Sequence, residues 1–419
     1  MYHKHKIKYK LYDSDENKLE KINNKKKITK LTESTESLKS TNIFYYINTD
    51  RISNIIKYNN KVSAKIINAK NKIDNYNNYN NYNQWDKAKK ITNPYDKIYI
   101  TYKKKKNEPL SRSYFKMIEM SQEFLKKIID CDKPIKTVHL AEGPGGFIEG
   151  LIELRKLNSS VHQYKDKYYG MTLAPKNEYI PGWTRSCNFL KKNKNVYIVK
   201  GIDNTGDLYN VDNHNYLISR IGNDKADLVT GDGGFDFSVD YNQQEILAYK
   251  LIFSQIILGL SIQAKHGTFI CKLFDTNTLL SKQMIYILMM HYKRVYYYKP
   301  VTSRPANSEK YIICEDFSGI NDYEIYQLQN ILTIWNKLPK SYSVTSIMEE
   351  HTINDKMIEA IDETNNELQD IQISYINSTI SLIKKPMNRY DLTNNINTQV
   401  KNSESWINNY ADKLIDQII

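Results

Sequence analysis

The chain has 419 residues, enough for one large domain with extensions or for two domains. Hydrophobic residues make up 40% and can fill a core, but no apolar run reaches the about 18 residues of a membrane span, so a membrane-spanning protein is excluded. The net charge of +13 favours a polyanionic partner such as nucleic acid, although Asn, Lys, Ile and Tyr are abundant throughout and weaken that argument.

The N-terminal part differs in texture from the rest. Residues 1–84 are rich in Lys and Asn without a sustained apolar period, which predicts a basic, partly disordered extension in which only 43–68 is able to pack. From Trp85 onward apolar residues become regular, and 111–129 has the spacing of a helix.

Strands and helices then alternate. Strands are predicted at 136–141, 168–173, 195–199, 226–231 and 267–273, helices at 147–157, 242–264 and 278–291, and a final strand pair at 294–299 and 310–314. Repeated β-α units predict an α/β fold, a mainly parallel sheet with helices on both faces and an antiparallel final strand. Residues 85–320 are therefore expected to form one domain, and 321–419, where helical spacing returns, a helical extension.

The cysteines indicate a reducing compartment. They are widely spaced without a Cys-x-x-Cys pair, which argues against zinc and disulfides, and the N-terminus lacks the apolar core of a secretory signal. We expect a soluble intracellular protein without a metal, in the cytoplasm or nucleus, or in the host cytoplasm or virion if the AT-rich codon bias is that of a virus.

A glycine-rich turn, Glu142-Gly-Pro-Gly-Gly-Phe147, follows the first strand of the domain. In open α/β sheets ligands bind beyond the carboxyl ends of the strands, where such a turn lets the backbone approach them. The spacing is not the dinucleotide G-x-G-x-x-G, which argues against NAD. A glycine-rich β-turn-α link without a ligand is the alternative reading.

Three further segments each place an ionisable residue at or near a strand end: Asp232 in Gly231-Asp-Gly-Gly-Phe235, Lys272 in Cys271-Lys-Leu-Phe274, and Glu309 before the last strand. Lys272 interrupts an apolar strand, where an unpaired ammonium is costly, and a buried lysine whose pKa is lowered can act as a base. A turn aspartate, a lysine that reaches solvent and a surface glutamate are the ordinary alternatives. Together with the glycine turn, the set suits methyl transfer to a sugar hydroxyl.

These segments resemble the FtsJ-like (RrmJ-type) family of S-adenosylmethionine-dependent RNA 2'-O-methyltransferases, over about 90–316 and in order. The family's Lys-Asp-Lys-Glu tetrad corresponds to Lys116, Asp232, Lys272 and Glu309. Asn93-Pro-Tyr-Asp96 and Ser303-Arg-Pro-Ala-Asn-Ser-Glu309 are similar to the branch of cap-specific mRNA methyltransferases that act on the first transcribed nucleotide. The resemblance implies a Rossmann-like methyltransferase fold.

The resemblance also implies a mechanism. Lys272, its pKa lowered by burial and by Lys116, would deprotonate or polarise the ribose 2'-OH, while Asp232 and Glu309 hold the two lysines. S-adenosyl-L-methionine would be the cofactor, bound by Gly143, Pro144, Gly145, Gly146, Phe147, Asp207 and Asp232. The chain departs from many relatives in having Leu173-Ala-Pro where an acid follows the second strand, and Glu142 in place of a small residue.

The substrate implied is the capped 5' end of mRNA. Residues expected to contact it are Arg112, Asn242, Arg304 and Asn307. Two alternatives stay open: a ribosomal or transfer RNA 2'-O-methyltransferase of the same type, and an inactive RNA-binding scaffold with the same fold. The transcription or capping machinery is a candidate partner, and no membrane is expected.

Overall fold

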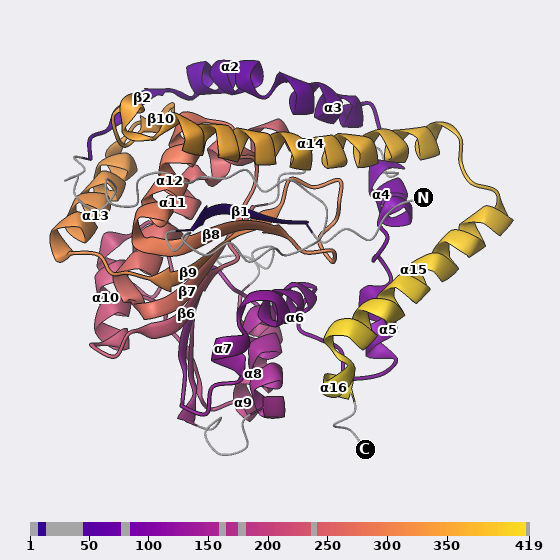
Figure 1. Cartoon of the computed structure of the whole chain (residues 1–419), viewed down its shortest axis with the longest axis horizontal. Helices are drawn as coiled ribbons and strands as arrows, with labels where there is room; N and C mark the ends of the chain where they lie inside the picture. The colour runs from indigo at the N-terminus through magenta and orange to yellow at the C-terminus, as the bar shows by residue number, and fades with distance from the viewer. Residues whose placement is uncertain are drawn as a thin grey trace.

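The fold is built on an eight-stranded sheet (Figure 1). The structure, a computed structural model, describes residues 7–13, 45–76, 84–158, 165–174, 182–235 and 241–415. The strand order of the sheet is β1-β8-β9-β7-β6-β3-β4-β5. The strands are β1 (Ile7–Asp13), β3 (Lys136–Leu140), β4 (Lys167–Met171), β5 (Val196–Ile198), β6 (Ala226–Gly231), β7 (Gln263–Leu273), β8 (Tyr292–Lys299) and β9 (Lys310–Phe317).

The sheet has a parallel part and an antiparallel part. The strands β5, β4, β3, β6 and β7 run parallel to one another, whereas β9 is antiparallel to both β7 and β8, and β1 is antiparallel to β8. The mainly parallel sheet with an antiparallel final strand is therefore confirmed. Because β9 runs in reverse, its first residue lies at the same edge of the sheet as the last residues of β6 and β7.

Helices cover both faces (Figure 1). One layer contains α6 (Ser113–Phe124), α7 (Lys126–Ile129) and α8 (Gly146–Asn158), and the other contains α10 (Val211–Ile221), α11 (Gln244–Ile262), α12 (Leu279–His291) and α13 (Asp322–Lys337). Successive side chains of β7 alternate between the layers: Phe269 and Cys271 belong to the core under α11, and Ile270 to the core under α6 and α8. Lys272 therefore points to the α6 side.

The helix α11 is apolar on all sides. Among the residues that the structure describes, Tyr241–Ile262 is the one helical stretch long and apolar enough to cross a membrane. Of the most apolar 18-residue part of this stretch, 83% is buried inside the protein, between the sheet and the other helices of the layer. This burial is typical of a central core helix.

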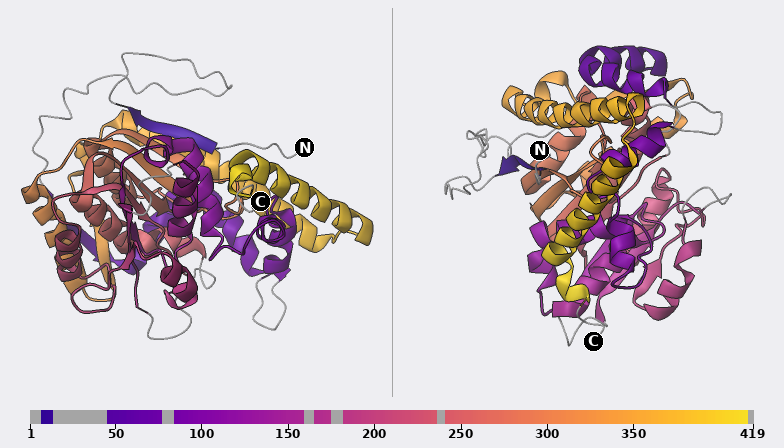
Figure 2. Two further views of the ribbon diagram at one scale, coloured as in Figure 1. Left: turned by 90° about the horizontal axis from the view of Figure 1, so that it is seen from below. Right: turned by 90° about the vertical axis from the view of Figure 1, so that its right-hand side faces the viewer.

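The remaining elements surround this α/β unit. They are β2 (Asn48–Arg51), α2 (Ile52–Val62), α3 (Ala64–Asp74), α4 (Gln84–Thr92), α5 (Ile98–Lys103), α9 (Cys187–Lys192), β10 (Tyr342–Ser346), α14 (Asp355–Lys384), α15 (Arg389–Tyr410) and α16 (Asp412–Ile415). The helix α3 packs along α14, and β2 pairs with β10 (Figure 1). Figure 2 shows α15 crossing back beside α5 towards the α6 layer.

Several of these elements were not predicted. Residues 7–13 form the edge strand β1, which pairs with β8 through the main chain and so needs no apolar period in its sequence. Within the stretch 43–68 that was expected to pack, the described part forms β2, α2 and the beginning of α3. The division of the chain at residues 84 and 320 stays a prediction.

Asparagine, which is abundant in this sequence, begins several helices. A side-chain oxygen of the residue before the helix accepts a hydrogen bond from a main-chain N–H of the first turn, which satisfies one of the free donors there. The residues that do so are Asn210 before α10, Asn321 before α13, Asn354 before α14 and Asn388 before α15.

Candidate active site

Four ionisable side chains meet at the carboxyl edge of the sheet on its α6 side. Asp232 directly follows β6, Lys272 is the penultimate residue of β7, and Glu309 directly precedes β9. Lys116 comes from the first turns of α6, which covers this face. Residues far apart in the chain thus converge because β6 and β7 end where the reversed strand β9 begins.

The four groups form a continuous chain of opposite charges. Lys116 Nζ lies 2.7 Å from Glu309 Oε1, and Glu309 Oε2 lies 3.9 Å from Lys272 Nζ. Lys272 Nζ in turn lies 2.9 Å from Asp232 Oδ1. Each side chain keeps between 12% and 16% of its surface exposed, so the cluster is enclosed yet accessible from solvent.

Two neutral side chains support the cluster. The Tyr311 hydroxyl donates to Asp232 Oδ1 at 2.7 Å and accepts from Lys116 Nζ at 3.4 Å. The Ser303 hydroxyl donates to Glu309 Oε1 at 2.7 Å. Neither was among the predicted site residues, although Tyr311 stands two positions after Glu309 and so on the same side of the extended chain.

The pKa of Lys272 differs from the prediction. Burial alone would lower it, but the opposing charges of Asp232 and Glu309 outweigh burial and raise the pKa of Lys272 above its usual value. The expected lowering was therefore wrong: it considered burial and a neighbouring lysine and not the two carboxylates at contact distance. For Glu309, burial is likewise outweighed, and Lys116 and Lys272 hold the pKa of its carboxyl well below the usual range.

The Asp232 turn is anchored from two sides. Its N–H donates to Leu140 O at 3.1 Å, and the N–H of Gly233 donates to Gln255 Oε1 of α11 at 3.1 Å. A Cβ atom at Gly231 would lie 2.5 Å from the same Gln255 oxygen, so a larger residue there would displace Gln255 from its bond to Gly233. These contacts fix the direction in which the Asp232 carboxylate leaves the sheet.

The glycine turn lies between β3 and α8, at the same edge. Gly145 has φ +103°, and a Cβ there would lie 3.1 Å from the Trp183 ring. At Gly146 a Cβ would lie 2.3 Å from Ser111 Oγ, so this glycine lets the starts of α8 and α6 come together. Of the other predicted cofactor residues in the turn, Phe147 has a fully buried side chain.

Glu142, the residue that departs from the family pattern, is buried beside the cluster. Its Oε1 accepts from the Phe147 N–H at 2.6 Å, while Oε2 has no hydrogen-bond partner within the part of the chain that the structure describes. Burial, followed by the charge of Asp232, raises the pKa of Glu142 well above its usual value.

Asp207 lies beyond the ends of β4 and β5. A Cβ at Gly206 would lie 1.9 Å from Thr172 O, which shows how closely the 201–207 loop packs on the end of β4. Asp207 Oδ1 accepts from the Tyr209 N–H at 2.8 Å, and Asp207 O accepts from Asn213 Nδ2 at 3.0 Å. These bonds hold the aspartate near the edge that carries the glycine turn.

The four predicted substrate residues are not all together. Arg112 is near Arg304 and Glu309: burial and then the charge of Arg304 lower its pKa, and its guanidinium donates to Asp96 O at 3.3 Å. The Nε atom of Arg304 is buried and has no hydrogen-bond partner among the described residues. Asn307 O accepts from Lys299, whereas Asn242 donates to Asn71 Oδ1 of α3 at 2.6 Å.

Comparison with known proteins identifies the domain that carries this site. The sequence matches the FtsJ-like methyltransferase family over residues 109–317, a stretch that contains all four clustered residues. Residues 109–317 belong to the FtsJ-like methyltransferase family. The match ends at the last residue of β9, so the FtsJ-like domain comprises the sheet from β3 onward with α6 to α12.

The curated relatives are longer proteins. The chain is 31% identical over 262 residues to the cap-specific mRNA (nucleoside-2'-O-)-methyltransferase 1 of Ailuropoda melanoleuca, a match that covers 57% of this chain and 29% of that protein. It is 33% identical over 215 residues to the protein of the same name from Trypanosoma cruzi, covering 50% of this chain and 57% of that protein. The chain thus spans only part of the length of the relatives it matches.

Among solved structures, fibrillarin of Aeropyrum pernix with natively bound S-adenosyl-L-methionine is similar at 13% identity, with a TM-score of 0.31 over 48% of this chain and 76% of that one.

Proposed function

We propose that this protein is an S-adenosylmethionine-dependent methyltransferase that modifies the ribose 2'-OH of the first transcribed nucleotide of capped mRNA. The observation that carries the proposal is the continuous Lys116–Glu309–Lys272–Asp232 cluster at the open edge of an FtsJ-like domain. The names of the curated relatives support both the reaction and the capped substrate.

The residues around the cluster fit the cofactor. The turn from Gly143 to Gly145 and the carboxylate of Asp207 lie on the edge where ligands of α/β sheets bind. S-adenosylmethionine supplies an electrophilic methyl group on a positively charged sulfur. Gly143, Pro144, Gly145 and Gly146 would approach its methionine part with the main chain, and Asp207 would accept from its nucleoside. Phe147, whose side chain is fully buried, would support the turn by packing in the core and would not contact the cofactor with its ring.

The cluster supplies what a ribose hydroxyl needs in order to react. A sugar hydroxyl is a weak nucleophile at neutral pH, so a base held against it contributes much of the rate. Lys272 Nζ would take the 2'-OH proton, Asp232 and Glu309 would orient Lys272, and Lys116 would keep Glu309 ionised. Tyr311 would fix Asp232 and Lys116 relative to each other. Transfer then depends on the alignment of hydroxyl and methyl group.

A positively charged edge beside the cluster suits the phosphates of the substrate. Burial and the nearby charge of Arg304 lower the pKa of Arg112, and Arg304 keeps a buried N–H donor without a partner in the described structure. Two neighbouring guanidinium groups are a common phosphate site, because they donate in a fixed planar geometry. We propose that they bind the RNA, with Asn307 beside them. Asn242 would contribute to RNA binding only if its side chain gave up the hydrogen bond to Asn71.

The alternatives have less support. A ribosomal or transfer RNA 2'-O-methyltransferase would use the same cluster, but the relatives that match over half of this chain are named as cap-specific mRNA enzymes. An inactive scaffold would not be expected to retain both lysines, both carboxylates and their hydrogen-bonded supports. Association with the transcription or capping machinery and an intracellular location stay predictions.

The substrate proposal is tested by a matched pair of RNAs. Purified protein with S-adenosylmethionine labelled in its methyl group should transfer label to RNA that begins with a methylated guanosine cap. The same RNA beginning with a triphosphate should accept at least about 100-fold less, since a site that binds a cap cannot be filled by the shorter end. Digestion to nucleosides should place the label on the first ribose. Equal labelling of both RNAs would contradict the cap assignment and favour the ribosomal or transfer RNA alternative.

The raised pKa of Lys272 predicts how the rate depends on pH. A lysine whose pKa lies above its usual value is protonated in the free protein at neutral pH, and only the deprotonated form can accept the hydroxyl proton. The value of kcat/KM for capped RNA should therefore rise with pH, close to tenfold per pH unit between about pH 7 and 9. Steady-state rates at fixed ionic strength measure this slope. A flat profile would show that Lys272 acts in its protonated form instead.

A further inference from the structure

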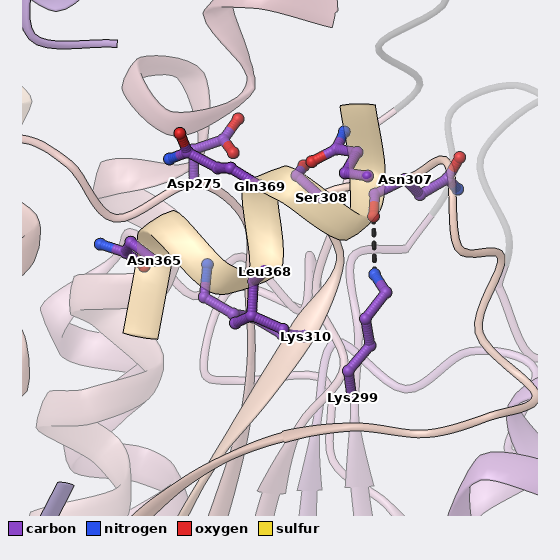
Figure 3. Close-up of a pocket in the computed structure, with 9 residues that line it drawn as sticks. Asp275, Lys299, Asn307, Ser308, Lys310, Asn365, Leu368 and Gln369 are labelled. Carbon is purple, nitrogen blue, oxygen red and sulfur yellow. Dashed lines mark hydrogen bonds between the residues drawn. The ribbon is translucent and has the colours of Figure 1, made fainter. Parts of the chain in front are cut away.

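The loop between β8 and β9 carries Glu309, and its main chain is held by a buried lysine. Lys299, the last residue of β8, donates from Nζ to Asn307 O at 2.6 Å and to Glu309 O at 2.7 Å. Figure 3 shows the first of these bonds beside a small pocket. One ammonium therefore joins the two residues on either side of Ser308, directly next to the catalytic carboxylate.

Neutral side chains hold the same loop from two other elements. The Ser308 hydroxyl donates to Gln244 Oε1 of α11 at 2.7 Å, and Gln372 Nε2 of α14 donates to Ala306 O at 3.1 Å. Of the three supports, Lys299 is the one that contacts Glu309 itself and the one whose donor group can carry a charge. Hydrogen bonds from charged donors are the stronger ones, so Lys299 is the main fixation point.

Burying the Lys299 ammonium costs free energy. A side chain that only filled space at this position would not need a charge. Lys299 is 8% exposed, and its charged neighbours are Glu309 from the loop, Lys310 from β9, Lys116 from α6 and Asp275 from the loop after β7, with Lys70 of α3 paired to that aspartate. Burial lowers the pKa of Lys299 to about 7, partly offset by Glu309. A methionine would fill the same space without this penalty.

We infer that Lys299 is a positioning residue for Glu309: it holds the main chain of the loop so that the Glu309 carboxylate stays between Lys116 and Lys272. This inference rests on the proposed methyltransferase function. Without the ammonium, two main-chain carbonyls next to Glu309 lose their donor and the loop loses its strongest anchor. The carboxylate would then sample positions at which it no longer spans both lysines, which slows transfer. The same loop carries Arg304 and Asn307, the proposed RNA contacts, so RNA binding would weaken as well, but less than transfer.

The test compares Lys299→Met with a matched control, Lys136→Met. Lys136 is also 8% exposed and also donates to main-chain carbonyls, those of Ile221 and Asp224, but it lies at the first residue of β3, at the opposite edge of the sheet. Both variants lose a buried ammonium, so a general loss of stability should be similar in both. Only Lys299→Met should lower kcat, by about 10- to 100-fold, because small misplacements of a catalytic group have effects of that size.

The KM for capped RNA should stay within about twofold of wild type in Lys136→Met. In Lys299→Met, whose loop also carries Arg304 and Asn307, KM should rise by a smaller factor than kcat falls, which separates positioning from substrate binding. Lys299→Arg keeps the charge and the donors and should recover part of the lost kcat; it also serves if the methionine variant does not fold. A raised KM with unchanged kcat would overturn the inference and make Lys299 an RNA contact. Equal losses in Lys299→Met and Lys136→Met, or an arginine variant no better than methionine, would also overturn it. If wild-type protein transfers no methyl group to any RNA, it is the proposed function that fails.

Discussion

Replacing Lys272 by alanine should lower methyl transfer to capped RNA by about 100- to 10,000-fold, the usual contribution of a general base. The substitution removes the one ammonium that lies between both carboxylates of the cluster, 2.9 Å from Asp232 and 3.9 Å from Glu309. The glycine turn and Asp207 are untouched, so the dissociation constant for S-adenosylmethionine should change by less than about threefold. Label transfer and calorimetric titration with the cofactor measure the two quantities separately.

Two further variants sharpen this result. Lys272→Arg keeps a positive charge but cannot give up its proton, so it should be nearly as inactive as the alanine variant. Lys265→Ala changes an exposed lysine on the same strand, β7, and should leave transfer unchanged. An active Lys272→Ala protein would reject Lys272 as the base. An active arginine variant would show that charge alone is required at this position.

Replacing Arg155 by methionine should lower the free energy of unfolding by about 3–5 kcal/mol, because it leaves the carboxylate of Asp166 buried without its partner. Both side chains are fully buried, and the two guanidinium–carboxylate contacts are 2.9 Å and 3.1 Å long. Arg155 also donates to the main-chain carbonyls of Ile128 and Ile129, at 3.1 Å and 3.0 Å. It thus joins the end of α8, the end of α7 and the residue before β4.

Urea denaturation followed by circular dichroism measures the loss, with Lys156→Met as the control. Lys156 is the next residue and is exposed, so its substitution should change the free energy of unfolding by less than about 0.5 kcal/mol. Arg155 lies outside the catalytic cluster, so kcat of the folded Arg155→Met protein should equal that of wild type at low temperature. A stability close to wild type would mean that water or a rearranged side chain satisfies Asp166.

The order of strands and helices from 113 to 317 could be read from the sequence because local patterns determine it. Apolar runs bounded by glycine or polar residues predicted β3, β4, β6 and β7 to within a few residues of their ends, except that β7 begins four residues earlier. The helix α10 was missed: its sequence mixes polar and apolar residues with no clear stop before Gly222. The strands β1 and β10 were missed because each is held by pairing with a distant partner.

The members of the proposed catalytic cluster were predicted by residue type and family pattern. The direction in which the pKa of Lys272 shifts was not predicted correctly. Spacing and resemblance predicted Lys116, Asp232, Lys272 and Glu309, and the structure brings all four into contact. The sequence could not show that two carboxylates would lie close enough to Lys272 to reverse the effect of burial on its pKa. Coulombic interaction depends on distances between side chains from different strands.

The sequence by itself therefore determined the α/β class, the glycine turn and the residue types of the proposed catalytic cluster, since periodicity and motif are local properties of the chain. Only the tertiary structure decided how these groups are held. The reversal of β9 brings Glu309 to the edge where β6 and β7 end. Ser303 and Lys299 support Glu309 there, and Tyr311 holds Asp232. The N-terminal strand β1 and the helices α3 and α14 lie on the same unit through pairing and packing across long separations in the chain. Such contacts depend on strand direction and on side-chain distance, which no local pattern encodes.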